Sequence, residues 1–293
     1  MARSNWRIGM VGLGALGQPM AINLHQARHT LQVHTRSRRD ENDSELSEAR
    51  RCINPSAAAD NVDVLLLYVS DDSAVNNVLF GPDGAAERLQ PGSVVIDCST
   101  ISPKGAQQAA AQLERIGVRY IDAPVTGGTE GARAGTLTVL VGGNAAVLAK
   151  VRPLLDVIGG SVHHIGPVGR GQQAKAVNQV LVAGSYAAVA EAIALGQRLK
   201  LPMQQVIEAL GSGAAGSWAL NHRSEAMLQG NYPLGFKLSL HRKDLGIALE
   251  TANSVELDMP ITALVAQLET DLIQKGYGDD DVSALHRWNT ARE

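Results

Sequence analysis

A glycine-rich turn between an apolar strand and a helix is the feature that most restricts the fold of this chain. Residues 12–17 read Gly-Leu-Gly-Ala-Leu-Gly and follow directly on the apolar run Ile8–Val11. In such a turn Gly12 allows a tight bend, Gly14 lets backbone approach a pyrophosphate, and Gly17 permits close packing of helix on strand. The start of the next helix attracts the negative charge. A tight turn without a ligand is the alternative, and the strand–turn–helix context favours a dinucleotide-binding fold.

Apolar runs and amphipathic segments alternate through the first half, which predicts strands separated by helices. The runs are rich in Val, Ile and Leu, so the sheet should be mostly parallel and covered on both faces. Ser102 and Pro103 have the residue types of a helix cap and a first helical position. The predicted strands are Ile8–Val11, Leu31–Thr35, Val62–Val69, Ser93–Asp97, Arg119–Asp122 and Leu137–Val141, with helices near 15–28, 72–80, 103–116 and 144–157.

The sequence changes character after about residue 166. Gln172–Lys200 is rich in Ala, Val and Leu without proline, and a helix over these 29 residues would be ~43 Å long. The acidic run Asp279–Asp281 is interpreted as a solvated helix start. No strand is predicted here, and helices are predicted near 203–211, 217–229, 238–254, 261–275 and 281–290. The chain is therefore predicted to be α/β, with an N-terminal Rossmann domain at 1–166 and an all-α domain at 167–293 that begins with the long helix.

Composition and charge exclude several classes of function. The 293 residues are enough for two domains, and 26 Lys and Arg against 29 Asp and Glu give a net charge of −3. This balance, with 3% aromatic residues, argues against nucleic-acid partners. Cys52 and Cys98 stand outside any CxxC or Cys/His cluster, so neither a disulfide framework nor a metal site is expected. Without a signal-peptide pattern or an apolar run of the ~18–20 residues that a membrane span needs, the protein is expected to be soluble and cytoplasmic.

The residues after the second strand indicate which dinucleotide binds. An NAD-binding chain usually has Asp or Glu about 20 residues after the glycines, to hold the ribose 2′-hydroxyl. Here residues 33–39 read Val-His-Thr-Arg-Ser-Arg-Arg, with no carboxylate. An arginine at this place, such as Arg36, can pair with a 2′-phosphate. Asp40 and Glu41 follow closely, so a solvated basic loop is the alternative; NADP(H) is favoured over NAD(H).

A second cluster, Asp122-Ala-Pro-Val-Thr-Gly-Gly128, stands at the end of a predicted strand. The C-terminal ends of parallel strands are where α/β proteins bind ligands. Thr126 has a hydroxyl, and the glycines after it expose backbone N–H groups that can cup a carboxylate. By itself this segment is more often an ordinary turn.

A third cluster opens the long helix, where Lys175 and Asn178 stand three residues apart and hence on one face. Burial of a lysine in an apolar stretch disfavours its ammonium form and suits it to proton transfer. A snorkelling surface lysine is the alternative. Residues 242–245, Arg-Lys-Asp-Leu, lie on a later helix, where a surface ion pair is the simpler interpretation.

Together these clusters resemble the β-hydroxyacid dehydrogenase family, which includes 3-hydroxyisobutyrate, tartronate semialdehyde and succinic semialdehyde/glyoxylate reductases. The resemblance covers nearly the whole chain. It implies a Rossmann domain, a long interdomain helix and an all-α domain, with a homodimer or homotetramer built through the helices. It is carried by Gly9-x-x-Gly12-Leu13-Gly14-x-x-Gly17-x-x-Met20-Ala21-x-Asn23-Leu24, Asp97-x-Ser99-Thr100, the segment 122–128, Lys175-x-x-Asn178 and Lys243-Asp244.

The resemblance also implies roles for individual residues. Lys175 matches the catalytic lysine, which reverses the surface interpretation. With the residues suggested by the glycine turn and the basic loop, the expected cofactor-binding residues are Gly12, Leu13, Gly14, Ala15, Leu16, Gly17, Thr35, Arg36, Thr100 and Lys243. The expected substrate-binding residues are Thr126, Gly127, Gly128, Asn178, the pocket aromatic Phe236 and the acidic neighbour Asp244. Ser70, where relatives often have proline, is one departure from the pattern.

The implied activity is hydride transfer between NADP(H), or less favourably NAD(H), and a small 3- or 4-hydroxy acid or its semialdehyde. Lys175 would give or take the proton, without a metal. Two alternatives remain open. Imine reductases share the architecture but typically have another residue at the lysine position, and an inactive binding protein would not need the full set of site residues. The partner is a small carboxylate-bearing molecule, with neither nucleic acid nor membrane expected.

Overall fold

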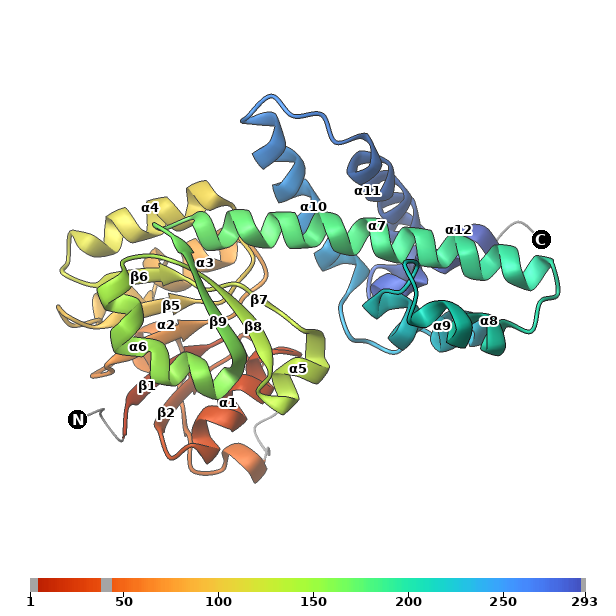
Figure 1. Cartoon of the computed structure of the whole chain (residues 1–293). Coiled ribbons are helices and arrows are strands. Elements are labelled where there is room, and N and C mark those ends of the chain that lie inside the picture. The colour runs from red at the N-terminus through yellow and green to blue at the C-terminus, as the bar shows by residue number, and fades with distance from the viewer. Residues whose placement is uncertain (1–4, 38–43, 291–293) are drawn as a thin grey trace. The chain divides into compact units, whose positions relative to one another are not determined.

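The computed structural model describes residues 5–37 and 44–290, which form two compact units (Figure 1). The first unit is Met1–Lys175 and the second is Ala176–Glu293. The boundary falls inside one long helix, α7 (Arg170–Arg198), so this helix begins in the first unit and continues into the second.

The first unit is built on a nine-stranded sheet within the described residues. Strand order is β3-β2-β1-β4-β5-β6-β8-β7, with β9 paired to β8. From β1 the chain adds β2 and β3 on one side and then β4, β5 and β6 on the other. The reversal between β1 and β4 is the switch point at which doubly wound sheets bind ligands. Among the described strands of this sheet, only the pairs β6–β8 and β7–β8 are antiparallel. The strands are β1 (Arg7–Val11), β2 (Thr30–His34), β3 (Arg50–Arg51), β4 (Val64–Leu67), β5 (Val94–Asp97), β6 (Arg119–Asp122), β7 (Val125–Thr126), β8 (Leu137–Gly142) and β9 (Gly159–Gly166).

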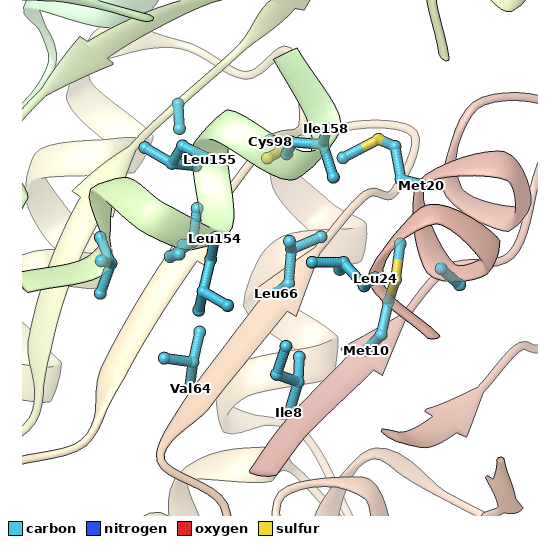
Figure 2. Packing of buried hydrophobic residues seen from close by; sticks show 14 of the residues in the cluster. Ile8, Met10, Met20, Leu24, Val64, Leu66, Cys98, Leu154, Leu155 and Ile158 are labelled. Carbon is cyan, nitrogen blue, oxygen red and sulfur yellow. The ribbon is translucent and has the colours of Figure 1, made fainter. Parts of the chain in front are cut away.

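Helices cover both faces of this sheet, because alternate residues of its strands point to opposite sides. On β4, Val64 and Leu66 pack in one core and Leu65 and Leu67 in the other. The first core holds α1 (Gly17–Gln26), α5 (Gly128–Ala134) and α6 (Ala145–Ile158); the second holds α2 (Pro55–Ala58), α3 (Asp72–Phe80) and α4 (Pro103–Glu114). Figure 2 shows the first core, where Met20 and Leu24 of α1 and Leu154 and Ile158 of α6 meet the strands.

Local capping fixes where several of these helices begin. Ser102 accepts a hydrogen bond at Oγ from the backbone N–H of Gly105, at 2.9 Å, and Pro103 is the first residue of α4. Asp71 caps α3 through the N–H of Ala74 at 2.8 Å, and Asn144 caps α6. The predicted cap at Ser102 is therefore confirmed.

The second unit is helical, apart from one isolated bridge between Lys237 and Asp281, in the part of the chain that the structure describes. Its core gathers side chains of α7 such as Ala183, Tyr186 and Ile193 with those of later helices. These helices are α8 (Met203–Gly211), α9 (Trp218–Gln229), α10 (Leu238–Asn253), α11 (Pro260–Leu272) and α12 (Arg287–Thr290), with a 3₁₀ turn at Val282–His286. The predicted fold class, a Rossmann domain joined by a long helix to an all-α domain, is confirmed.

By length and composition, α7 could also cross a membrane. Its most apolar window has a mean hydropathy of 1.4, and 44% of that window is buried in the protein. No apolar run long enough for a membrane span is expected from the sequence, and by mean hydropathy α7 contradicts this expectation. Small residues such as Gly184 and Ser185 interrupt the apolar run, but the mean hydropathy of the window stays high. A helix in a protein core has the same composition, so this property alone does not assign α7 to a membrane.

The structure has several short elements that the sequence pattern does not predict, among which β3, β7 and β9 form by pairing with other strands. The helix expected from residue 15 begins at Gly17, and α2, α5, β3, β7 and β9 were not predicted. The expected solvated helix start is only partly solvated. Asp279 is exposed, whereas the side chain of Asp281 is 1% exposed and pairs with Arg223 at 3.5 Å. Asp281 does begin the 3₁₀ turn, by accepting from the N–H of Ser283 at 3.0 Å.

Candidate active site

The C-terminal ends of five parallel strands lie in one row, called here the strand-end row. The register pairs Val11 with His34 on one side and with Leu67 on the other. It continues from Leu67 to Asp97 and from Asp97 to Asp122. Ligands of open α/β sheets bind beside such a row. The segments that leave it contain most of the predicted residues of the first unit: Gly12–Gly17, Thr35, Arg36, Thr100 and Thr126–Gly128.

The glycine turn has the geometry that the sequence pattern predicts. Gly12 has φ +100°, and a Cβ there would collide with the backbone oxygen of Tyr68. A Cβ at Gly17 would collide with the backbone oxygen of Gly12, so the helix start packs directly on the turn. A Cβ at Gly14 would meet no atom of the described residues within 4 Å, which leaves space beside its backbone. Within residues 5–37 and 44–290, no side chain caps the start of α1. The turn therefore fits a pyrophosphate.

The other three residues of the turn differ in what they can offer a ligand. Leu13 is 7% exposed and its side chain belongs to the core beneath, so its backbone alone can face a ligand. Leu16 packs against the same core, and Ala15 is exposed.

Thr35 and Arg36 follow directly on β2, beside the glycine turn. The N–H of Gly12 donates to the backbone oxygen of His34 at 2.9 Å, which joins the two segments. Thr35 is half-buried. Arg36 is exposed, which is compatible with a guanidinium that pairs with a phosphate at the surface. Arg38, Arg39, Asp40 and Glu41, which bear on the choice between NADP(H) and a solvated loop, lie outside the described residues.

Thr100 follows a buried acidic turn at the end of β5. Asp97 is fully buried; its Oδ1 accepts from the N–H of Ser99, and its Oδ2 from the hydroxyl of Tyr120, both at 2.9 Å. Burial raises the pKa of Asp97 to about 6, although these hydrogen bonds lower it. Thr100 itself is half-buried at the strand-end row.

Asp122, beside Asp97 in the register, is also fully buried. Burial raises its pKa to about 6, against the lowering effect of backbone N–H groups. After it, Thr126 is half-buried on β7 and pairs with Thr138 of β8. Gly127 and Gly128 have φ of +130° and +64°, backbone conformations that favour glycine, and they lead into α5. The glycines that follow Thr126 therefore adopt backbone conformations that leave this turn without side chains beyond the hydroxyl.

Lys175 is 7% exposed, within the second turn of α7. The surface interpretation of this lysine is therefore wrong. Asn178 is half-buried three residues further along the helix.

In the second unit, hydrogen bonds join three predicted residues through a fourth that was not predicted. The Asn178 side-chain amide donates to Oε1 of Gln179 at 2.6 Å, and Gln179 donates to Oδ2 of Asp244 at 2.7 Å. Lys243 then pairs with Oδ1 of Asp244 at 2.9 Å. Gln179 and Asp244 are buried, so the expected surface ion pair is a largely buried one. In the sequence, Gln179 is only a polar residue within an apolar helix, next to Asn178. We call Asn178, Gln179, Asp244 and Lys243 the amide–carboxylate relay.

Phe236 lies outside this relay, in a separate contact of the second unit. Its ring meets that of His241 edge to face, with centroids 5.5 Å apart. His241 and Glu269 are fully buried, with Nδ1 of His241 2.6 Å from Oε1 of Glu269. Phe236 is half-buried, and its ring contacts His241 of this buried His241–Glu269 pair.

Two family models match the chain in succession. Residues 7–166 match the NAD binding domain of 6-phosphogluconate dehydrogenase, and residues 169–289 match the NAD-binding domain of NADP-dependent 3-hydroxyisobutyrate dehydrogenase. The chain belongs to the β-hydroxyacid dehydrogenase family. It is an NAD(P)-dependent oxidoreductase, and the resemblance seen in the sequence motifs is confirmed.

Individual proteins are similar to this chain over nearly their whole length. The 2-(hydroxymethyl)glutarate dehydrogenase of Eubacterium barkeri is 35% identical, over 95% of this chain and 93% of the relative. The 2-hydroxy-3-oxopropionate reductase of Escherichia coli K12 is 36% identical, over 95% of each chain. The structure of Psf3 in complex with NADP+ and 2-OPP superposes with a TM-score of 0.89 at 26% identity, covering 96% of this chain and 99% of the other.

Proposed function

We propose that this β-hydroxyacid dehydrogenase transfers hydride between NADP(H) and a small 3- or 4-hydroxy acid or its semialdehyde, with Lys175 as proton donor and acceptor. The observation that carries the proposal is the burial of Lys175, 7% exposed, on a helix that begins beside the strand-end row. Burying a lysine side chain costs free energy, and buried titratable groups gather at functional sites more often than elsewhere.

The glycine turn supports the choice of a dinucleotide, and Arg36 supports the phosphorylated form. Gly12, Gly14 and the start of α1 would hold the pyrophosphate. Arg36, exposed after β2, would pair with a 2′-phosphate where an NAD enzyme would have a carboxylate. In the family, Thr100 and Lys243 match positions near the nicotinamide.

This chain's own residues would transfer the proton and bind the substrate carboxylate. When bound, the nicotinamide supplies or accepts the hydride. In reduction Lys175 gives a proton to the carbonyl oxygen; in oxidation its neutral amine takes the proton from the hydroxyl. The Thr126 hydroxyl and the N–H groups of Gly127 and Gly128 would bind the substrate carboxylate, and Asn178 would orient the reacting end.

We also propose that the protein is a homodimer or homotetramer built through its helical unit. On α7, Val177, Leu181 and Leu195 are 63%, 70% and 60% exposed, an apolar surface that a second copy of the chain would cover. Sedimentation of wild type and Leu181→Glu tests this: the variant should dissociate, and a wild-type monomer would contradict it.

The function is tested by following NADPH absorbance with a panel of semialdehydes, then of cyclic imines, for wild type and Lys175→Ala. We expect turnover of semialdehydes, a kcat at least ~10²-fold lower in the variant, and unchanged cofactor binding. Turnover of imines alone would favour the imine reductase alternative, and no turnover of either class would favour an inactive binding protein. A wild-type kcat in Lys175→Ala would show that the lysine does not transfer the proton.

A further inference from the structure

Two buried side chains in the first unit attach the start of α7 to the strand-end row. They are Asp122, fully buried, and Gln172, 1% exposed. Neither belongs to the residues expected to bind cofactor or substrate. Buried polar side chains are costly unless each finds partners, so their partners indicate what they hold in place.

Asp122 caps α7 from the end of β6. Its Oδ1 accepts from the backbone N–H of Gly169 at 2.7 Å, and its Oδ2 from that of Gln172 at 2.9 Å. A Cβ added at Gly171 would lie 2.7 Å from the same Oδ2, so only a glycine lets the helix lie this close to the carboxylate. The first turn of α7 is thus held directly against the sheet.

This cap differs from those of the neighbouring helices. Ser102 and Asn144 cap α4 and α6 from the residue next to each helix, which satisfies the free N–H groups locally. Asp122 stands 47 residues before Gly169. A local cap would stabilise α7 equally well, whereas a distant one also fixes where the helix lies relative to β6.

Gln172 makes the second attachment, to the turn that contains Thr100. Its Nε2 donates to the backbone oxygen of Ser99 at 2.8 Å, and its Oε1 accepts from the N–H of Ile101 at 3.2 Å. The two bonds therefore hold the backbone on both sides of Thr100. Gln172 and Lys175 are three residues apart on α7, which places them on one face, ~4.5 Å apart along the axis.

We infer that Asp122 and Gln172 are positioning residues, which set the proton donor Lys175 against the Thr100 turn and the Thr126–Gly128 turn. This inference rests on the proposed function, because it takes Lys175 as the proton donor. Asp122 begins the segment that leads to Thr126, and Gln172 holds the turn of Thr100. Small displacements of a reacting group cost much rate, so both attachments should affect the chemical step more than binding.

The test compares purified wild type with Gln172→Leu and Asp122→Asn, which change size little. Each variant should lower kcat ~10- to 100-fold. In Asp122→Asn the Kd for NADPH should stay within ~2-fold, because the glycine turn is untouched. In Gln172→Leu the Kd should rise by a smaller factor than kcat falls, because this variant also loosens the turn of the predicted cofactor residue Thr100. With 4-deuterated NADPH the kinetic isotope effect on kcat should rise, since hydride transfer becomes slower than product release. Amide hydrogen exchange should quicken at residues 99–102 and in the first turn of α7. If Gln172→Leu does not fold, the same measurements on Asp122→Asn alone test the inference.

Ser93→Ala is the matched control. Ser93 is also buried in the first unit, and its Oγ donates to the backbone oxygen of Gln90 at 2.7 Å, but it precedes β5 and so lies at the opposite end of the strand. It should lose stability without losing kcat. Unchanged hydrogen exchange in both variants, unchanged kcat despite quicker exchange, or an equal loss of kcat in Ser93→Ala would each overturn the inference. A wild-type protein that turns over no hydroxy acid or semialdehyde would instead overturn the proposed function, and the inference with it.

Discussion

Gln179 donates a hydrogen bond from its side-chain amide to Oδ2 of Asp244 at 2.7 Å, and both side chains are buried. This bond joins α7 to α10, the two helices that carry Asn178 and Lys243. Because a carboxylate accepts hydrogen bonds strongly, the bond fixes Asp244 and, through it, the ammonium of Lys243. The relay therefore couples the predicted substrate residue to the predicted cofactor residue within one unit.

Replacing Gln179 by Leu should destabilise the protein and impair catalysis together. Asp244 would keep its ion pair with Lys243 but lose the buried hydrogen bond from Gln179. Losing this bond should lower the free energy of unfolding by about 1.5–3 kcal/mol. Urea denaturation measures this loss, and kcat/KM for the hydroxy acid should fall as well. Gln197→Leu is the control: Gln197 is an exposed glutamine of the same helix that bonds outside the relay. Its Nε2 lies 3.4 Å from the backbone oxygen of Leu228, and its Oε1 lies 3.2 Å from Nε2 of His286. Equal effects of the two substitutions would show that the relay has no special role.

The relay also shows where prediction from sequence ends. The glycine turn was predicted because Gly12, Gly14 and Gly17 act on their own neighbours, between a strand and a helix formed nearby. Gln179 was not predicted, because its partner Asp244 stands 65 residues away. Only the packing of α7 on α10 brings the two side chains together. The interpretation of Asp281 was incomplete for the same reason, since burial against Arg223 follows from the fold and not from the acidic run.

Cofactor preference should depend on Arg36. In Arg36→Asp a partner of the 2′-phosphate is lost and a carboxylate that can accept from a ribose hydroxyl is gained, so the ratio of kcat/KM for NADPH to that for NADH should fall. Arg115→Asp, an exposed arginine at the end of α4, makes the same change of charge elsewhere and should leave the ratio unchanged. If the ratio stays constant in both, Arg36 is a solvated loop residue.

Thr126→Val should separate carboxylate recognition from general damage. The substitution removes a hydroxyl with little change of size, and a hydrogen bond to a charged group contributes ~1.5–3 kcal/mol. We expect kcat/KM to drop roughly 10- to 150-fold for a semialdehyde with a carboxylate, and far less for an aldehyde without one. Thr138→Val, the same change at the residue paired with Thr126, should affect neither substrate. Equal losses for both aldehydes would place the carboxylate elsewhere.

Asp97 should make stability depend on pH, and the direction follows from its raised pKa. The usual pKa of 3.8 applies to the unfolded chain, and burial raises it to about 6 in the folded protein. Between these values the folded protein binds more protons than the unfolded chain, so the free energy of unfolding falls as pH rises through this window. Below it the stabilising contribution is fully present; above it the carboxylate is ionised in the core, at a cost of about 3 kcal/mol.

Asp97→Asn removes this titration and should therefore become more stable relative to wild type as the pH rises from 4 to 7. The amide can still accept from Ser99, and the Tyr120 hydroxyl can turn to accept from the amide, so the hydrogen bonds at this position can be kept. Wild type retains a further slope from Asp122, whose pKa is also about 6, so the difference between the two proteins is the quantity to follow. Urea unfolding at several pH values measures it, with Asp156→Asn on the exposed face of α6 as a control that removes one carboxylate from the surface. A difference that stays constant across this pH range would show that Asp97 keeps one charge state throughout, and that its burial does not set the acid stability of the fold.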